Sequence, residues 1–286
     1  MISKRILIVG CGKIGLRVAN LLSSNHKVWG LRRSQPQNEN GDIQFIAADV
    51  CNPNSLSKLP KDLDYVIYCL TPEERSETAY RHVYLTGLQN ILSALPDKQI
   101  LKRLYFISST SVYHQNDNQY VDESSPTSPV NFSGQILLAA EAICSASKHP
   151  STVIRFSGIY GAQRSHLIHQ VESGQAKLSK ESRLTNRIHE DDCVGFIHYL
   201  IQEDIRGNTN EPLFLASDCE PIDLNQVITF LASNLDIKLE SKNSGKPDTR
   251  RAGNKKCSNT KMLNSGYQLH YPSYREGYLA MLAKQS

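Results

Sequence analysis

Three glycines near the start of the chain have the spacing of a backbone site for phosphate. Gly10, Gly12 and Gly15 follow a short apolar run and precede a helix-period segment. In this pattern the first glycine permits a tight turn, the second lets a diphosphate approach the backbone, and the third lets the helix pack closely on the strand. The first helical residues, Lys13 and Ile14, then offer amide donors at the positive end of the helix dipole. Because a strand precedes the glycines and a helix follows them, the pattern predicts a dinucleotide site.

Two arginines stand where the second strand of such a site would end. The apolar run KVWGL (27–31) is followed by Arg32 and Arg33, and the next acidic residue is Glu39. An NAD site places Asp or Glu here for the ribose hydroxyls, whereas a guanidinium group pairs bidentately with phosphate. The arginines therefore favour NADP, through its 2′-phosphate. NAD stays open, because arginines at such a place are often only solvated surface charges.

Asp49 follows the third apolar run and is the predicted contact of the adenine amino group, with Val50 beside it. The alternative is an aspartate that only forms the turn after the strand.

The elements that must position these residues alternate along the first two thirds of the chain. The apolar runs are 5–10, 27–31, 45–50, 65–70, 103–109 and 152–157, and the main helix-period segments are 13–23, 77–95 and 135–147. Continuous apolar strands separated by helices are typical of a parallel sheet covered on both faces. We therefore predict an α/β fold, a Rossmann-type doubly wound parallel sheet with a smaller C-terminal α/β lobe.

The alternation of apolar runs and helix-period segments becomes less regular after Gly161. We predict two parts on this basis. The dinucleotide-binding Rossmann domain takes 1–161 plus 187–217, and the smaller substrate-binding lobe takes 162–186 plus 218–286.

Composition excludes several classes of function. Of 286 residues, 40% are hydrophobic and 21% are charged, as in ordinary soluble globular proteins. The seven cysteines form no CxxC pair, which argues against a disulfide framework and a zinc site. We therefore expect no metal, and we expect a cytoplasmic location. The net charge of +4 is mild, and no apolar run reaches membrane-spanning length. Neither nucleic acid nor a membrane is an expected partner.

Further segments occur in a known order. They are AADV (47–50), YLTGLQNIL (84–92), FISSTSVY (106–113), RFSGIYG (155–161) and NRIHEDD (186–192). Together with the glycine turn, they make the chain resemble the extended short-chain dehydrogenase/reductases, the NAD-dependent epimerase/dehydratase family, along nearly its whole length. The family's usual TGxxGxxG has one more residue between the first two glycines, so the chain resembles its atypical members.

This resemblance implies an NAD(P)-dependent reaction on a small molecule. Many relatives form dimers through two helices that match 77–95 and 135–147, so a homodimer is an expectation by analogy. Ser109 matches the family's catalytic Ser/Thr, whose hydroxyl binds the substrate oxygen. A strand-end serine that only satisfies backbone groups is the alternative.

The family's catalytic tyrosine and lysine are missing in this alignment. The family helix reads roughly Tyr-Gly-x-Ser-Lys-x-x-x-Glu, and alignment on Glu141 places Ser133 at the tyrosine and Leu137 at the lysine. Alcohol oxidation needs a base, and lowering a tyrosine pKa from ~10 by about 3 requires about 4 kcal/mol. The pKa of a serine hydroxyl is far higher than that of tyrosine, so lowering it to neutrality would require about 12 kcal/mol. Ser133 and Leu137 therefore do not form a replacement pair.

Other groups could supply the proton, namely Tyr113, His114, Glu123 and Glu141. Tyr113 is the named candidate, with packing beneath the following loop as its alternative. Three functions stay open on these grounds: an NADP-dependent oxidoreductase, a non-catalytic NADP(H)-binding sensor or regulatory protein, and a sugar-nucleotide epimerase or dehydratase. The third is the most weakened by Ser133, because those reactions begin by oxidising a hydroxyl.

Overall fold

The computed structural model describes residues 2–34, 41–181, 183–208, 211–239 and 253–284. The chain divides into two compact units, each built from separate segments. Unit 1 comprises Met1–Val112, Pro129–Arg155 and Val194–Phe214, and unit 2 comprises Tyr113–Ser128, Phe156–Cys193 and Leu215–Ser286. Compared with the division expected from the sequence, 113–128, 156–161, 187–193 and 215–217 lie in unit 2.

Unit 1 is built on a seven-stranded sheet in the order β11-β7-β5-β4-β1-β2-β3. Its strands are β1 (Arg5–Val9), β2 (Lys27–Arg32), β3 (Ile43–Ala47), β4 (Tyr65–Tyr68), β5 (Arg103–Ser109), β7 (Ser151–Phe156) and β11 (Leu213–Ala216). The central strand β1 pairs in parallel with both β2 and β4, and β5 continues in parallel beyond β4. The predicted doubly wound parallel sheet is confirmed.

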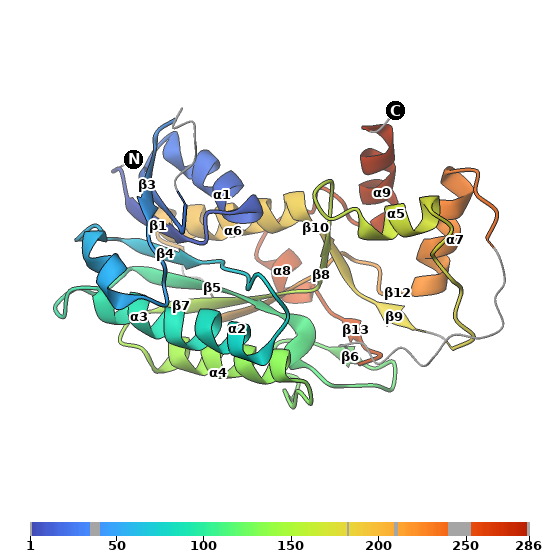
Figure 1. The fold of residues 1–286 in the computed structure, drawn as a ribbon, viewed down its shortest axis with the longest axis horizontal. Helices are drawn as coiled ribbons and strands as arrows, with labels where there is room; N and C mark the ends of the chain where they lie inside the picture. The colour runs from blue at the N-terminus through green and yellow to red at the C-terminus, as the bar shows by residue number, and fades with distance from the viewer. Residues whose placement is uncertain (1, 35–40, 182, 209–210, 240–252, 285–286) are drawn as a thin grey trace. The chain divides into compact units, whose positions relative to one another are not determined.

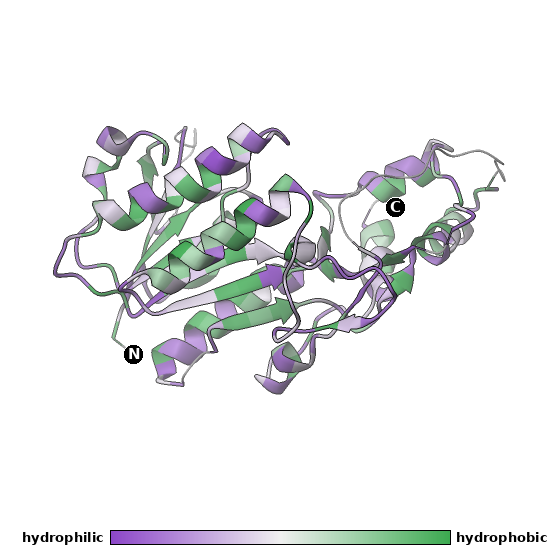
Figure 2. Ribbon diagram, turned by 90° about the horizontal axis from the view of Figure 1, so that it is seen from below, coloured by the Kyte–Doolittle hydropathy of each residue, from purple (hydrophilic) through white to green (hydrophobic). Residues whose placement is uncertain are grey.

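Helices cover both faces of this sheet, as Figure 1 shows. One face carries α1 (Lys13–Ser23) and α6 (Glu190–Arg206), and the other carries α2 (Glu77–Arg81), the π-helical η2 (His82–Gly87), α3 (Leu88–Ala94) and α4 (Phe132–Ala146). Hydrophobic residues gather on the strands and on the inner sides of the helices in Figure 2. Helix α4 begins earlier than predicted, because the Asn131 side chain caps it by accepting the Gly134 N–H at 2.8 Å.

The segment 77–94 is held against the turn that follows β3. A Cβ on Gly87 would lie 2.6 Å from Val50 Cγ2, so only glycine allows this approach. Asn90 Nδ2 donates a hydrogen bond to Val50 O at 2.8 Å. Tyr68 Oη donates to Val83 O at 2.5 Å, inside the π-helical turn. The Gly and Asn of YLTGLQNIL therefore fix the loop that carries Asp49.

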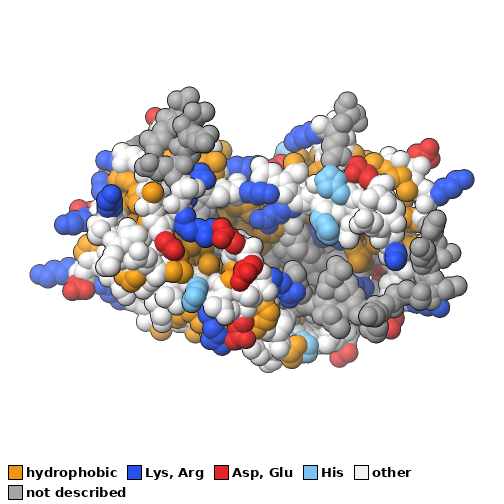
Figure 3. Space-filling view, viewed as in Figure 1, with side chains coloured by type: hydrophobic (Ala, Val, Ile, Leu, Met, Phe, Trp, Pro, Cys, Tyr) orange, Lys and Arg blue, Asp and Glu red, His pale blue; other side chains and the backbone are white. Residues whose placement is uncertain are grey.

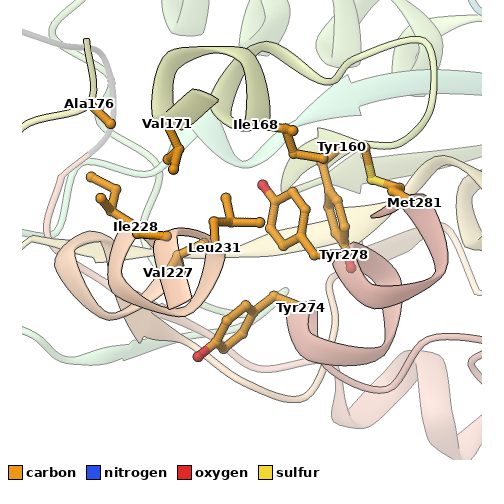
Figure 4. Packing of buried hydrophobic residues seen from close by; sticks show 11 residues of the cluster. Tyr160, Ile168, Val171, Ala176, Val227, Ile228, Leu231, Tyr274, Tyr278 and Met281 are labelled. Atoms are coloured by element: carbon orange, nitrogen blue, oxygen red, sulfur yellow. The ribbon is translucent and has the colours of Figure 1, made fainter. Parts of the chain in front are cut away.

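In its described residues, unit 2 contains short strands and four helices of its own. The strands are β6 (Tyr120–Val121), β8 (Gly158–Tyr160), β9 (Leu184–Thr185), β10 (Arg187–His189), β12 (Ile222–Asp223) and β13 (Lys256–Cys257), and the helices are α5 (His166–Glu172), α7 (Leu224–Asn234), α8 (Thr260–Asn264) and α9 (Tyr274–Ala283). Its core lies between α5, α7 and α9, where Tyr160 packs on Tyr278 with ring centroids 4.6 Å apart (Figure 4). Tyr160 is thus a core residue of unit 2.

Asp192 fastens the C-terminal part of unit 2 to the start of α6. It is fully buried and accepts hydrogen bonds from Tyr267 Oη, His270 N and Tyr271 N at 2.7–3.0 Å. The NRIHEDD segment therefore has a structural role at this residue.

Within the described ranges, no helix combines the length and the apolar character needed to cross a membrane. Across the same residues, no group of three or more His, Cys, Asp or Glu side chains is arranged to hold a metal ion. Acidic and basic side chains are interspersed on the face of the molecule drawn in Figure 3.

A buried ion pair connects three elements of unit 1. Glu141 on α4 accepts hydrogen bonds from Arg155 Nε at 3.0 Å and Nη2 at 2.6 Å, and from Ser108 Oγ at 2.5 Å. Ser108 lies on β5 and Arg155 on β7, and both charged side chains are less than a tenth exposed. The pair fixes the position of α4 on the sheet.

Glu141→Ala should lower the free energy of unfolding of unit 1 by about 3–5 kcal/mol, because it leaves Arg155 buried without a counter-charge. Fluorescence of Trp29, the only tryptophan and a buried residue of β2, reports urea unfolding of this unit. Glu77→Ala, which breaks the exposed pair with Arg81, is the control and should cost less than about 0.5 kcal/mol. The double variant Glu141→Leu/Arg155→Leu should recover much of the loss. Equal effects of Glu141→Ala and Glu77→Ala would contradict the assignment.

Candidate functional site

The turn between β1 and α1 needs glycine at two positions for structural reasons. Gly10 has φ +98°, in the left-handed region, and a Cβ there would lie 2.8 Å from the backbone nitrogen of Leu70. A Cβ on Gly15 would lie 2.3 Å from Gly10 O. A side chain at either position would push the turn, the helix or the segment after β4 apart. These two glycines set the tight turn and the close helix packing.

Gly12 is different, because a Cβ there would meet nothing within 4 Å. It is exposed and stands at the N-cap of α1, where no side chain caps the helix and no acidic residue lies in the first turn. Lys13 is exposed and Ile14 half-buried directly after it. An 11-residue helix therefore presents its positive end over a bare backbone position. This arrangement fits the diphosphate of a dinucleotide.

Arg32 and Arg33 lie at the end of β2, in the same unit. Arg32 is the last residue of the strand and is half-buried, while Arg33 is exposed. Arg33 Nη2 forms an ion pair with the Glu73 carboxylate, which raises the pKa of Arg33 and lowers that of Glu73. Sequence reasoning missed Glu73, because it is separated from Arg33 by 40 positions and no local pattern marks it.

Asp49 and Val50 follow β3. Asp49 is exposed, and its Oδ1 accepts the Cys51 N–H at 2.9 Å in a local turn. Val50 is buried beneath Gly87. The turn-forming geometry of Asp49 is observed, and its contact with adenine stays a prediction.

Ser109 and Ser133 lie where β5 and α4 come together. A Cβ on Gly134 would lie 2.4 Å from Ser111 O, so this glycine lets α4 approach the 3-10 turn η3 (Thr110–Val112) directly after β5. Ser109 is half-buried and its Oγ accepts the Ser111 N–H at 3.2 Å. Ser133 is buried, and its Oγ donates to the capping Asn131 Oδ1 at 2.6 Å.

Leu137 is buried one turn further along α4. It carries no charge that could lower the pKa of a neighbouring hydroxyl. At the two aligned positions, the helix thus offers a hydroxyl engaged in capping and an apolar side chain.

Three of the other candidate proton donors are engaged in structural bonds. Tyr113 is 1% exposed, and its Oη donates to Asp122 O at 2.8 Å. Glu123 accepts the Leu215 N–H at 2.7 Å, and Glu141 is held by Arg155. His114 is half-buried. The geometry of Tyr113 favours packing over proton transfer.

Unit 2 buries two charged side chains that the sequence pattern did not single out. Lys255 is 1% exposed, its Nζ donates to Tyr113 O at 3.4 Å, and burial lowers its pKa. Asp218 is also 1% exposed, and burial raises its pKa to about 8. Its Oδ1 accepts the Glu220 N–H at 3.2 Å, while Oδ2 has no partner among the described residues.

Asp218→Asn should stabilise unit 2 at neutral pH. The pKa of Asp218 is raised from 3.8 to about 8 in the folded protein, so the folded state holds the proton more tightly than the unfolded chain between about pH 4 and pH 8. The free energy of unfolding should therefore fall as pH rises through this range, by up to about 4 kcal/mol at pH 7. In Asp218→Asn this fall should be absent. Amide hydrogen exchange of α7 measures it, and parallel pH profiles of the two proteins would contradict the expectation.

The chain is similar to several known proteins. The model of the "NAD dependent epimerase/dehydratase family" matches residues 6–214. A solved structure from Methylobacillus flagellatus, named for the same family, is 38% identical, with a TM-score of 0.82, and the alignment covers 99% of this chain and 98% of that one. The UDP-glucuronic acid 4-epimerase of Bacillus cereus, solved with UDP-glucuronic acid and NAD, is 21% identical, with a TM-score of 0.80 and coverage of 98% and 99%.

This chain matches only a small part of one curated relative. An uncharacterised protein of Mycobacterium tuberculosis (strain ATCC 25618 / H37Rv) is 30% identical over 107 residues, which are 37% of this chain and 12% of that protein. The family match, in contrast, extends from β1 to the start of β11 and includes the glycine turn, β5 and α4. The chain belongs to the NAD-dependent epimerase/dehydratase family.

Proposed function

We propose that this protein binds NADP(H) in preference to NAD(H) and is an oxidoreductase that acts on a small molecule without the family's usual Tyr/Lys pair. The observation that carries the proposal is the exposed, uncapped start of α1 at Gly12. Arg32 and Arg33 lie at the end of β2, the strand that pairs with β1 just before this turn. Structures of family-like proteins with bound NAD support the dinucleotide, and the two arginines support NADP.

The residues that would hold the cofactor all belong to unit 1. The backbone of Gly12, Lys13 and Ile14 would hold the diphosphate, and Arg32 and Arg33 would hold the 2′-phosphate. The loop of Asp49 and Val50 would lie at the adenine. When bound, the nicotinamide supplies or accepts a hydride.

The proposed direction of reaction is reduction. Oxidation of an alcohol needs a base, and Ser133 is engaged by Asn131 while Leu137 has no charge. Reduction of an activated carbonyl or double bond makes a smaller demand, because solvent or a weak acid can deliver the proton. In this scheme the Ser109 hydroxyl holds the substrate oxygen.

A second candidate function is a non-catalytic NADP(H)-binding sensor. It is favoured by one set of observations, namely that the hydroxyls of Tyr113 and Ser133 and the carboxylate of Glu141 are all engaged in structural bonds. Sugar-nucleotide epimerase or dehydratase activity ranks third. The Bacillus cereus epimerase binds such a substrate, but its class of reaction requires hydroxyl oxidation first.

Arg32→Ala/Arg33→Ala should remove the preference for NADPH, because the double variant loses the charges proposed for the 2′-phosphate. Isothermal titration at about 50 mM salt should show NADPH binding at least tenfold more tightly than NADH in the parent protein, and equally in the variant. Arg81→Ala, an exposed arginine of the same unit, is the control and should keep the preference. Equal affinities in the parent protein would contradict the NADP assignment.

Gly12→Ala should separate cofactor binding from folding. The added methyl group meets no protein atom, so the free energy of unfolding should change by less than about 1 kcal/mol. The same methyl group lies where the diphosphate would approach, so the affinity for NADPH should fall at least tenfold. Gly15→Ala is the contrast, since it should destabilise the protein itself. An unchanged NADPH affinity in folded Gly12→Ala would contradict the site.

Stereospecific loss of isotope from labelled NADPH, incubated with a panel of carbonyl compounds, distinguishes the enzyme from the sensor. The reductase proposal expects transfer of one of the two C4 hydrogens.

A further inference from the structure

The end of β2 carries a charge arrangement that the strand alone does not predict. Glu73 lies in the segment after β4, and in the sheet order β4 is separated from β2 by β1. The segment nevertheless brings the Glu73 carboxylate to Arg33 Nη2. The Arg33 and Glu73 side chains are 59% and 73% exposed, so the pair lies at the surface, where a ligand can compete for it.

The Arg33–Glu73 pair places an acid, as NAD sites use, next to an arginine, as NADP sites use. NAD is recognised by an acid that accepts hydrogen bonds from the ribose hydroxyls, and NADP by an arginine that pairs with the 2′-phosphate. No acid follows β2 directly, but Glu73 supplies one from another loop. A 2′-phosphate, with a charge of about −1.5 to −2, would be repelled by Glu73 and would compete with it for Arg33.

Both a bound 2′-phosphate and the nearby carboxylates would interact with Arg33. Asp49 adds to the negative potential at Arg33, and Arg32 stands beside it at the end of the strand. Glu74 is not equivalent to Glu73, because its carboxylate accepts a hydrogen bond from Ser76 Oγ at 2.6 Å at the start of α2. The two neighbouring glutamates therefore have different partners.

We propose that Glu73 sets the choice between NAD(H) and NADP(H): its carboxylate holds Arg33 and is suited to the ribose hydroxyls of NAD(H), and a 2′-phosphate must displace it. This inference rests on the proposed dinucleotide site and names the residue that limits its preference for NADP(H).

The expected change in cofactor affinity is modest because the Arg33 and Glu73 side chains are exposed. Exposed ion pairs contribute little, but the doubly charged phosphate raises the repulsion, so removing the Glu73 charge should change the affinity about three- to tenfold. Salt at 0.5 M screens exposed charges beyond a few ångströms, so the effect should shrink there. A purely structural role of Glu73 would not give this dependence on salt.

The test measures the dissociation constants of NADPH and NADH by isothermal titration for the full chain at 50 mM and 500 mM salt. The variants are Glu73→Gln, Arg33→Gln and the double variant, with Glu74→Gln as the matched control. Glu73→Gln should strengthen NADPH binding about three- to tenfold relative to NADH at low salt. The gain should be smaller at high salt, and smaller again when Arg33 is also replaced, because only the direct repulsion by Glu73 then remains to be removed. Glu74→Gln should leave the ratio unchanged.

The outcomes separate this inference from the proposed function. If Glu73→Gln leaves the ratio of the two affinities unchanged, or strengthens both cofactors equally, Glu73 does not set the choice. If the parent protein prefers NADH and Glu73→Gln moves the ratio toward NADPH, the inference stands and the proposed NADP(H) preference fails. If neither cofactor binds any variant, the dinucleotide site itself is wrong and the inference falls with it.

Discussion

The buried pair between Glu141 and Arg155 fixes the helix that carries the candidate catalytic positions. With Ser108, it fastens α4 to β5 and β7, and it leaves the helix no freedom to slide or rotate without burying an unpaired charge. Leu137 and Ser133 lie one and two helical turns before Glu141, so both are fixed on one stripe of α4. Gly134 brings this part of the helix against Ser111, directly after β5. Ser133 and Leu137 are therefore held at fixed positions on the helix.

The parallel strands and the glycine turn were predictable from the sequence because they depend on local patterns. Continuous apolar runs identified β1, β4 and β5, and the spacing of Gly10, Gly12 and Gly15 identified the turn. The start of α4 was placed too late, because the apolar period begins after the capping Asn131. Glu73 and Lys255 were not found, because the first reaches Arg33 across the sheet and the second is buried by segments distant in the sequence. Charge identity is visible in a sequence, but pairing and burial over long separations are not.

The proposed dinucleotide site and the proposed loss of the Tyr/Lys pair rest on different physical features, so the first does not depend on the second. The site consists largely of backbone: a left-handed Gly10, an open Gly12 and the first turn of α1. Its proposed preference for NADP(H) rests on exposed charges near β2, which individual substitutions can change with little loss of stability. The proposed loss of the Tyr/Lys pair, in contrast, concerns two side chains of α4, of which Ser133 donates a hydrogen bond to the capping Asn131.

The most direct measurement of the central claim is phosphorus NMR of NADP⁺ bound to the full protein, because it observes the diphosphate and the 2′-phosphate separately. Both resonances should shift on binding. The arginines at the end of β2 should also hold the second pKa of the 2′-phosphate below its free value of about 6. A bound diphosphate with a 2′-phosphate that titrates as it does in free NADP⁺ would contradict the claim.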